Sequence, residues 1–319
     1  MIFSHSTSPF SSHRPGSGRS FPRQSAVRPL LLALLVMGGV SLASGSLLAT
    51  SSAVWAQPQV DLPTGSLDGR WAKIQLNGQL RVGIDPALGQ AYLYTNPDSR
   101  SYEGFEWDIL QALAETLELT LDPVYVPWDL QLEALQAGEI DLAFGAREPD
   151  GLDQSAFLAT DPYYFSPQRL VIPANLEDPP ERLSQLFGLR VGIVVNSTGA
   201  ALLETYNRSR GNAIRLFGSS NPERLFDQLQ GGQLDAVVID QPVAVVAVAE
   251  AEGQQPLLLV GPPLLARPLV GVVDRDYPSV KQAIDQGILS LRQGGKLRQI
   301  LEDWQLWDST ATFPALSED

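Results

Sequence analysis

Leu80-Arg81-Val82-Gly83-Ile84 recurs later in the chain as Leu189-Arg190-Val191-Gly192-Ile193. The stretch Leu135-Gln136-Ala137-Gly138-Glu139-Ile140-Asp141 likewise recurs, in the same order, as Leu229-Gln230-Gly231-Gly232-Gln233-Leu234-Asp235. Each copy reads as an apolar strand, a helical stretch, a helix end containing glycine and another apolar strand. Chance could produce one such match between common α/β patterns. Two matches in the same order predict a duplicated architecture.

Helices are expected between the strands of each copy. Apolar residues between Phe105 and Leu117 recur at helical spacing, and Asn221-Pro222 has the pattern of an N-cap followed by proline at the first helical position. Gly138 and Gly231 stand where a left-handed helix end is expected. Strands are expected at 80–84, 122–126, 140–145, 169–173, 189–195, 213–217, 234–239, 257–260 and 269–273. This alternation predicts an α/β protein with two mostly parallel sheets covered by helices.

The chain is expected to cross twice between two lobes. The second copy ends near residue 262, so the strand at 269–273 and the helical stretch at 279–307 have no partner within it and are expected to return to the first lobe. Two crossing strands make a hinge that bends and resists twisting. We therefore expect lobe 1 at 78–169 and 268–307, and lobe 2 at 170–267.

The N-terminal residues have the pattern of an export signal. The first 60 residues contain no Asp or Glu; they begin with a stretch containing four arginines, continue through an apolar run from Leu30, and reach small residues at Val54-Trp55-Ala56. This predicts a signal peptide at 1–56, cleaved before Gln57, with a single membrane anchor as the alternative. We expect a linker at 57–77 and a C-terminal tail at 308–319.

Composition excludes several classes of function. The formal charge is −14, and without residues 1–56 the chain has 18 basic against 36 acidic residues, a charge of −18, which disfavours nucleic acid as a partner. Both histidines lie in the first 56 residues and there is no cysteine. The rest of the chain therefore lacks the residues of Ser-His-Asp and Cys-His enzymes and of the usual zinc sites. We expect no metal, no cofactor and a monomer.

Ligands of open parallel sheets bind beyond the carboxyl ends of the strands. In the first lobe this rule selects Asp85, Arg147 and Glu148, and in the second it selects Ser197-Thr198-Gly199 and Asp240. The backbone N–H groups at a helix start suit a carboxylate, and an acidic side chain suits an ammonium group. Asp85 and Asp240 could instead only terminate strands, and Asn196-Ser197-Thr198 could serve only as an N-cap.

Aromatic residues concentrate in the first lobe and could supply the apolar wall of such a site. Trp128 follows the strand at 122–126 and precedes a helix, a position from which it can reach the site. Tyr92 or Tyr94 is the second aromatic candidate.

From about Gly78 to Trp307 the chain resembles the bacterial extracellular solute-binding proteins of amino-acid ABC transporters, family 3, which have the two-lobed type II periplasmic-binding fold. The resemblance implies a receptor in the periplasm that closes on a small polar, amino-acid-like ligand and delivers it to a membrane permease. It is carried by these motifs: Leu80 to Asp85, Tyr102 to Ile109, Leu135 to Asp141, Asp161-Pro162-Tyr163-Tyr164, Arg190 to Ile193, Ser197-Thr198-Gly199 and Leu234 to Asp240.

The resemblance also implies roles for individual residues. Asp240 would bind the α-ammonium group of the ligand, and Trp128 would pack on the ligand. Asp85 matches a position that often touches the ligand side chain. Thr198 and Gly199 match groups that meet the α-carboxylate.

The chain departs from the family at the strongest carboxylate ligand. Members usually carry Thr-x-x-x-x-Arg after the strand of Asp141, and counting without gaps puts Glu148 at the threonine and Asp153 at the arginine. Three alternatives follow: Arg147 takes over the clamp; the ligand is a cation without a carboxylate, of the polyamine or betaine type, drawn by Asp85, Glu148, Asp153 and Asp240; or the protein is a sensor or orphan receptor.

Three classes of function remain. A transport receptor, which is not an enzyme, is expected to bind one solute without turnover. A dehydratase-like enzyme would use Glu148 and Asp153 as a carboxylate acid/base pair. A signalling receptor would present its closed form to a membrane kinase or chemoreceptor.

Overall fold

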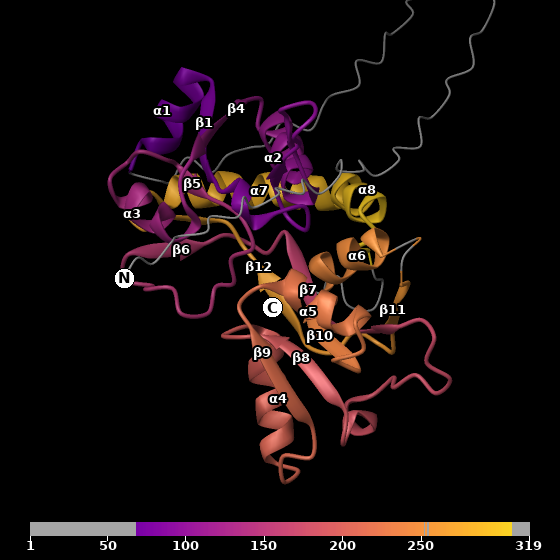
Figure 1. Cartoon of the computed structure of the whole chain (residues 1–319). Helices are drawn as coiled ribbons and strands as arrows, with labels where there is room; N and C mark the ends of the chain where they lie inside the picture. Colours follow the sequence, from indigo (N-terminus) through magenta and orange to yellow (C-terminus); the bar gives the residue numbers. More distant parts are fainter. Residues whose placement is uncertain (1–67, 252, 254, 308–319) are drawn as a thin grey trace, which may run out of the picture. The chain divides into compact units, whose positions relative to one another are not determined.

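The computed structural model describes residues 68–307 with the exception of 252 and 254 (Figure 1). The predicted signal peptide at 1–56 and the predicted tail at 308–319 lie outside the described residues. Within the described part, no helix is both long enough and apolar enough to cross a bilayer.

The first sheet has the strand order β4-β1-β5-β13-β6. Its strands are β1 (Gln79–Ile84), β4 (Thr120–Tyr125), β5 (Leu142–Ala143), β6 (Phe157–Ala159) and β13 (Val272–Asp274). β1 runs parallel to both β4 and β5, whereas β13 runs antiparallel to β5 and to β6. The sheet is therefore mixed, with one reversed strand.

The second sheet has the order β11-β7-β10-β8-β9, and β12 pairs with β7 beside this path. Its strands are β7 (Tyr164–Pro173), β8 (Arg190–Val194), β9 (Arg215–Ser219), β10 (Ala236–Asp240), β11 (Leu257–Val260) and β12 (Ala266–Leu269). β8 is parallel to β9 and β10, and β7 is antiparallel to β10, β11 and β12. The prediction of an α/β fold with two sheets is confirmed, and both sheets are mixed, because one reversed strand in each makes the antiparallel pairs.

The repeated motif has a common physical basis in both sheets. A Cβ on Gly83 would lie 2.6 Å from Ile140, and a Cβ on Gly192 would lie 2.7 Å from Leu234. The central glycine of each copy therefore makes room for the apolar residue that precedes the Asp of the matching segment. In each copy the arginine of the strand also donates side-chain hydrogen bonds to that Asp. Arg81 binds Asp141, and Arg190 binds Asp235.

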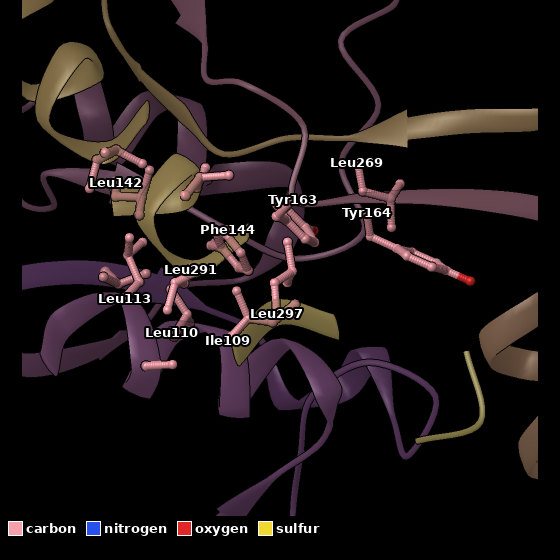
Figure 2. Close-up of a cluster of buried hydrophobic side chains, with 14 of the residues drawn as sticks. Ile109, Leu110, Leu113, Leu142, Phe144, Tyr163, Tyr164, Leu269, Leu291 and Leu297 are labelled. Atoms are coloured by element: carbon pink, nitrogen blue, oxygen red, sulfur yellow. The ribbon is translucent and has the colours of Figure 1, made fainter. Parts of the chain in front are cut away.

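Helices from both ends of the described chain build the first core. They are α1 (Arg70–Asn77), α2 (Phe105–Thr116), α7 (Pro278–Gln293) and α8 (Lys296–Asp303), whereas α3 (Gln131–Gln136) packs in a separate hydrophobic cluster against the same sheet. Figure 2 shows Ile109 and Leu113 of α2 beside Leu142 of the sheet and beside Leu291 and Leu297 of the last two helices. The C-terminal helices thus share a core with the first sheet.

The second sheet is packed with α4 (Thr198–Arg208), α5 (Pro222–Gln230) and α6 (Gln241–Glu250). Asn221 caps α5 as predicted, because its Oδ1 accepts a hydrogen bond from the backbone N–H of Glu223 at 2.8 Å. The prediction for Gly231 was wrong by one residue. The left-handed residue after α5 is Gly232, with φ +68°, so the helix runs one residue further before it reverses.

Three further elements differ from the sequence predictions. Residues 70–77, predicted as linker, form helix α1, because Trp71 and Ile74 are spaced to bury one face. The single strand predicted at 269–273 is the end of β12 followed by β13. β6 was not predicted, since three residues give no periodicity to detect.

The two predicted crossings lie side by side. β7 and β12 pair antiparallel, with Tyr164 opposite Leu269 and Pro167 opposite Ala266. This arrangement is compatible with a two-strand hinge, and the lobe boundaries stated above stay a prediction.

Candidate functional site

Polar residues at the ends of strands from the two sheets meet directly. The Tyr92 hydroxyl, from the first lobe, donates to Oδ2 of Asp240 at 3.2 Å. The Thr198 hydroxyl, at the start of α4, donates to Oε1 of Glu148 at 2.7 Å. The structure therefore brings together four of the residues that sequence reasoning selected, two from each predicted lobe.

Asp240 is a carboxylate that lacks a cation. It is the last residue of β10 and precedes α6, but its side chain does not cap that helix. Burial raises the pKa of Asp240 to about 6, and the nearby charge of Glu148 acts in the same direction, whereas hydrogen bonds from Gln168 and Tyr92 oppose the rise. Within the described residues no lysine or arginine pairs with Asp240. A positively charged ligand group would satisfy it.

Gln168 is a site residue that sequence reasoning missed. Its amide Nε2 donates to Oδ1 of Asp240, and the residue is only 1% exposed. A Cβ on Gly199 would lie 2.6 Å from its Oε1, so glycine lets the first turn of α4 approach this amide. The available signal was a lone glutamine in the mostly apolar crossing strand β7.

Arg147 is a buried cation that lacks an anion. It is 5% exposed, and its guanidinium carbon lies 4.0 Å from the centre of the Trp128 ring. One terminal nitrogen donates to the Trp128 carbonyl at 2.7 Å and lies 3.4 Å from Oε1 of Gln131. Nε has no hydrogen-bond partner among the described residues, and none of their carboxylates pairs with the guanidinium. Desolvation lowers the pKa of Arg147 to about 10, which leaves it charged at neutral pH.

Trp128 lies beside this arginine and is bonded to Asp85. The backbone N–H of Trp128 donates to Oδ2 of Asp85 at 2.9 Å, and its indole N–H donates to the Gly145 carbonyl at 2.7 Å. The other oxygen of Asp85 accepts the backbone N–H of Ala87 at 2.9 Å. Both carboxylate oxygens of Asp85 thus accept hydrogen bonds from backbone N–H groups. Trp128 has 37% of its surface exposed.

A second missed residue, Glu106, positions the loop that carries Arg147. Glu106 is fully buried on α2 and accepts hydrogen bonds from the Tyr163 hydroxyl at 2.5 Å and from the backbone N–H of Ala146 at 2.8 Å. The second bond anchors Ala146 at φ +47°, immediately before Arg147. Burial raises the pKa of Glu106 to about 7. Its sequence signal was an acid among apolar residues in the Gly104-Phe105-Glu106 segment.

Glu148 joins three elements. Besides accepting the Thr198 hydroxyl, it lies with Oε2 3.3 Å from Nε of Arg267 on β12. Arg267 also pairs with Asp150. A carboxylate with these partners links the loop after β5, the start of α4 and one of the two crossing strands.

Two of the predicted residues have local partners only. Asp153 is exposed and accepts hydrogen bonds from the backbone N–H and the hydroxyl of Ser155, at 2.9 and 2.6 Å. These bonds lower the pKa of Asp153. Ser197 caps α4, with Oγ accepting the Ala200 N–H at 3.1 Å. The structure thus does not bring Asp153 together with the other candidates. Among residues 68–307, apart from the two gaps, no cluster of three His, Cys, Asp or Glu side chains could hold a metal ion.

Comparison with known proteins identifies the family of the chain. The sequence profile described as bacterial extracellular solute-binding proteins, family 3, matches residues 80–306. The probable amino-acid-binding protein YxeM of Bacillus subtilis is 21% identical over 70% of this chain and 83% of its own length. The L-cystine-binding protein TcyJ of Escherichia coli is 22% identical over 74% of this chain and 86% of its own length.

Solved structures share the fold. Substrate binding domain 2 of GlnP from Lactococcus lactis, in an open conformation, superposes with a TM-score of 0.62 at 17% identity, covering 73% of this chain and 97% of that domain. This likeness supports the type II periplasmic-binding fold, in which two mixed sheets are present.

Proposed function

Because the chain belongs to the bacterial extracellular solute-binding proteins of family 3, we propose that it captures a free amino acid and delivers it to the permease of an ABC transporter. Members of this family are binding proteins, so the chain is a receptor and not an enzyme. The names of the bacterial relatives, which include amino-acid-binding and L-cystine-binding proteins, support an amino acid as the ligand class.

The observation that carries the proposal is a pair of unmatched charges. Arg147 is 5% exposed, and among the described residues no carboxylate pairs with its guanidinium and no basic side chain pairs with Asp240. Burying an unpaired charge costs several kcal/mol, so each group is stabilised by an opposite charge. A free amino acid carries one ammonium and one carboxylate on the same carbon and can supply both.

The remaining groups fit the same ligand. The exposed part of the Trp128 ring offers an apolar face for the ligand side chain. The start of α4 at Thr198 and Gly199 offers backbone N–H groups to the ligand carboxylate, as helix N-termini do for anions. Arg147 would take over the role of the arginine that the family usually has five residues after its threonine.

The alternative of a cation without a carboxylate has less support. This alternative needs four acidic side chains at the site. Both oxygens of Asp85, however, accept backbone N–H groups, and Asp153 is exposed and bound to Ser155. Glu148 is bound to Thr198 and Arg267. Only Asp240 remains for a cation, which matches one ammonium group. The same placement of Asp153 removes support for a carboxylate pair with Glu148 as a catalytic acid and base.

The cellular setting is part of the proposal. Family members act outside the cytoplasm, and the basic and apolar start of the chain supports export followed by cleavage of residues 1–56. We infer that the exported protein acts in the periplasm as a monomer, with no nucleic-acid partner because of its strongly acidic composition.

The proposal is tested by a thermal-shift screen of the protein against the common amino acids, polyamines and betaines. A ligand present at a hundred times its Kd stabilises the folded protein by about 2.7 kcal/mol, which raises the Tm by several degrees. Arg147→Lys keeps the positive charge but loses the planar guanidinium, which can donate two parallel hydrogen bonds to a carboxylate. We expect it to weaken amino-acid binding by about tenfold or more, because hydrogen bonds to charged groups contribute about 1.5–3 kcal/mol.

Arg208→Ala is the matched control, since Arg208 is an exposed arginine on α4. It is expected to retain the full response. A response to polyamines or betaines alone, or an amino-acid response that Arg147→Lys leaves intact, would overturn the assignment.

A further inference from the structure

A second candidate site lies on the first lobe and shares no residue with the amino-acid site. It is a pocket of about 260 Å³ between α1, the start of β1 and the loop before β5. The lining residues are Arg70, Lys73, Ile74, Asn77, Gln79, Arg81, Gly138 and Asp141.

The pocket holds more positive charge than its one acid can neutralise. The side chain of Asp141 is 2% exposed and accepts hydrogen bonds from two arginines. Arg70 donates through Nε and a terminal nitrogen at 3.0 and 2.6 Å. Arg81 donates through the same two groups at 3.0 and 2.9 Å. Lys73 adds a third cation, and its side-chain ammonium makes no ion pair or hydrogen bond with any described residue. Three basic residues against one acid leave the lining with a net charge of +2. Asp122, opposite Arg81 on β4, lies outside the lining, but its charge acts on Arg81 and offsets part of this excess.

The second copy of the repeat serves as an internal comparison. There, among the described residues, Arg190 is the only basic side chain bonded to Asp235, although the charge of Arg215, opposite Arg190 on β9, also acts on that aspartate. A terminal nitrogen of Arg190 also donates to the Gly232 carbonyl at 2.9 Å. The matching Arg81 shares its aspartate with Arg70. The structural Arg–Asp pair therefore does not require a second arginine, and the extra charge of the first copy comes from α1.

Helix α1 holds these cations in place. Trp71 and Ile74 are buried, the Trp71 backbone N–H lies 3.2 Å from the Ser279 hydroxyl, and Asp68 accepts hydrogen bonds from the backbone and side chain of Ser279. The helix precedes residue 80, where the family match begins.

We propose that this pocket binds a doubly charged phosphate-class oxyanion, either free phosphate or a phosphate monoester headgroup. A phosphate group carries about −1.5 to −2 at pH 7, which is opposite in sign to the excess charge of the lining, and arginine and lysine are its usual protein ligands. The side-chain amides of Asn77 and Gln79 can donate further hydrogen bonds.

The test is a calorimetric titration of the full chain with inorganic phosphate at pH 7.5 and low salt. Wild-type protein is expected to bind phosphate at one site, and Lys73→Ala is expected to bind about tenfold more weakly, because one charged donor is lost. Lys296→Ala removes the same charge from an exposed position on α8 and is expected to bind normally. Arg147→Ala is also expected to bind normally, which separates this pocket from the amino-acid site.

A second arm identifies the source of the oxyanion. Flotation with vesicles of phosphatidylcholine, with and without phosphatidic acid, compares wild type with Lys73→Ala, so that residues 1–67 are the same in both proteins. Lys73-dependent binding to phosphatidic acid assigns a headgroup, and phosphate binding without it assigns a soluble oxyanion. Binding in neither arm, an equal loss in Lys296→Ala, or a loss in Arg147→Ala overturns the proposal.

Discussion

At the scale of single residues, the site rests on charges that the folded chain does not neutralise. Asp240 has an amide and a hydroxyl as partners, and both are neutral. Arg147 has backbone and amide oxygens and the face of an indole ring. Neutral partners keep a buried charge tolerable and leave it able to attract an opposite charge from a ligand.

The first prediction concerns the pH dependence of binding through Asp240. The pKa of the free protein's carboxyl is raised from 3.8 to about 6, and an ammonium group requires the ionised form. A proton therefore competes with the ligand below about pH 6, and affinity is expected to fall from pH 7 to pH 5, approaching tenfold per unit at the acidic end. Calorimetric titration with the amino acid found in the screen measures this slope.

Asp240→Asn removes the titrating group. We expect it to bind about tenfold or more weakly at pH 7.5 and to lose the part of the pH dependence that comes from Asp240. Asp153→Asn, which changes an exposed carboxylate away from the site, is expected to behave as wild type. An affinity for the amino acid that is constant between pH 5 and pH 7.5 in wild type would contradict the role given to Asp240.

At the scale of elements, the start of α2 organises the site as well as the core. Glu106 in its first turn anchors the loop before Arg147. The Tyr92 carbonyl, next to the helix start, accepts the backbone N–H of Glu106 at 3.3 Å. The same helix end therefore positions both Tyr92, which reaches Asp240, and Arg147.

The second prediction concerns Gly104, which precedes α2. Gly104 has φ +130°, and a Cβ there would lie 2.1 Å from the Tyr92 carbonyl oxygen. Gly104→Ala is expected to lower the free energy of unfolding by about 2–5 kcal/mol, because strain and a backbone clash add. Urea denaturation measures this loss, and amino-acid binding is expected to fall with it.

Gly69→Ala is the matched control. Gly69 precedes α1 with φ +63°, but a Cβ there would meet nothing within 4 Å. Its cost is expected to be only the left-handed strain of about 1–2 kcal/mol. Equal costs for the two variants would show that the Tyr92 clash is relieved by a small shift of the chain.

At the scale of the whole molecule, the two sheets are joined by the paired strands β7 and β12 and by side chains that reach across. Glu148 bonds both to Thr198 on the second lobe and to Arg267 on β12. Such polar bonds are few and exchangeable, so a ligand that bridges Arg147 and Asp240 is expected to shift the population towards the closed arrangement.

The third prediction concerns this closure. The chain has no cysteine, so spin labels can be attached at Asp129→Cys and Ser220→Cys, two exposed positions on the first and second lobes. Pulsed electron paramagnetic resonance is expected to show a shorter and narrower distance distribution when the amino acid is added. The same labels in an Asp240→Asn background are expected to change little at that concentration. A ligand that raises the Tm while leaving the label distances unchanged would contradict closure.

Much of the site could be anticipated from strand ends. Asp240, Thr198 and Glu148 follow predicted strands, and the structure joins them to other candidates. Gln168 and Glu106 could not be anticipated. Each lies within a strand or helix, and its role at the site depends on a hydrogen bond to a residue distant in the chain. Asp153 was selected by counting along a motif, which ignores the local bonds that hold it at the surface.

The repeat, the alternation of apolar strands and helices, and the lack of cysteine were sufficient to establish an α/β protein with two sheets and to exclude cysteine-based chemistry. These features depend on local periodicity and on residue type, and both can be read directly from the sequence. The counter-charges could be known only from the folded chain, because a charge is matched or unmatched according to its neighbours in space. Tertiary packing alone shows that, among the described residues, Arg147 has no acidic partner and Asp240 no basic one, and that Arg70 and Arg81 share one aspartate.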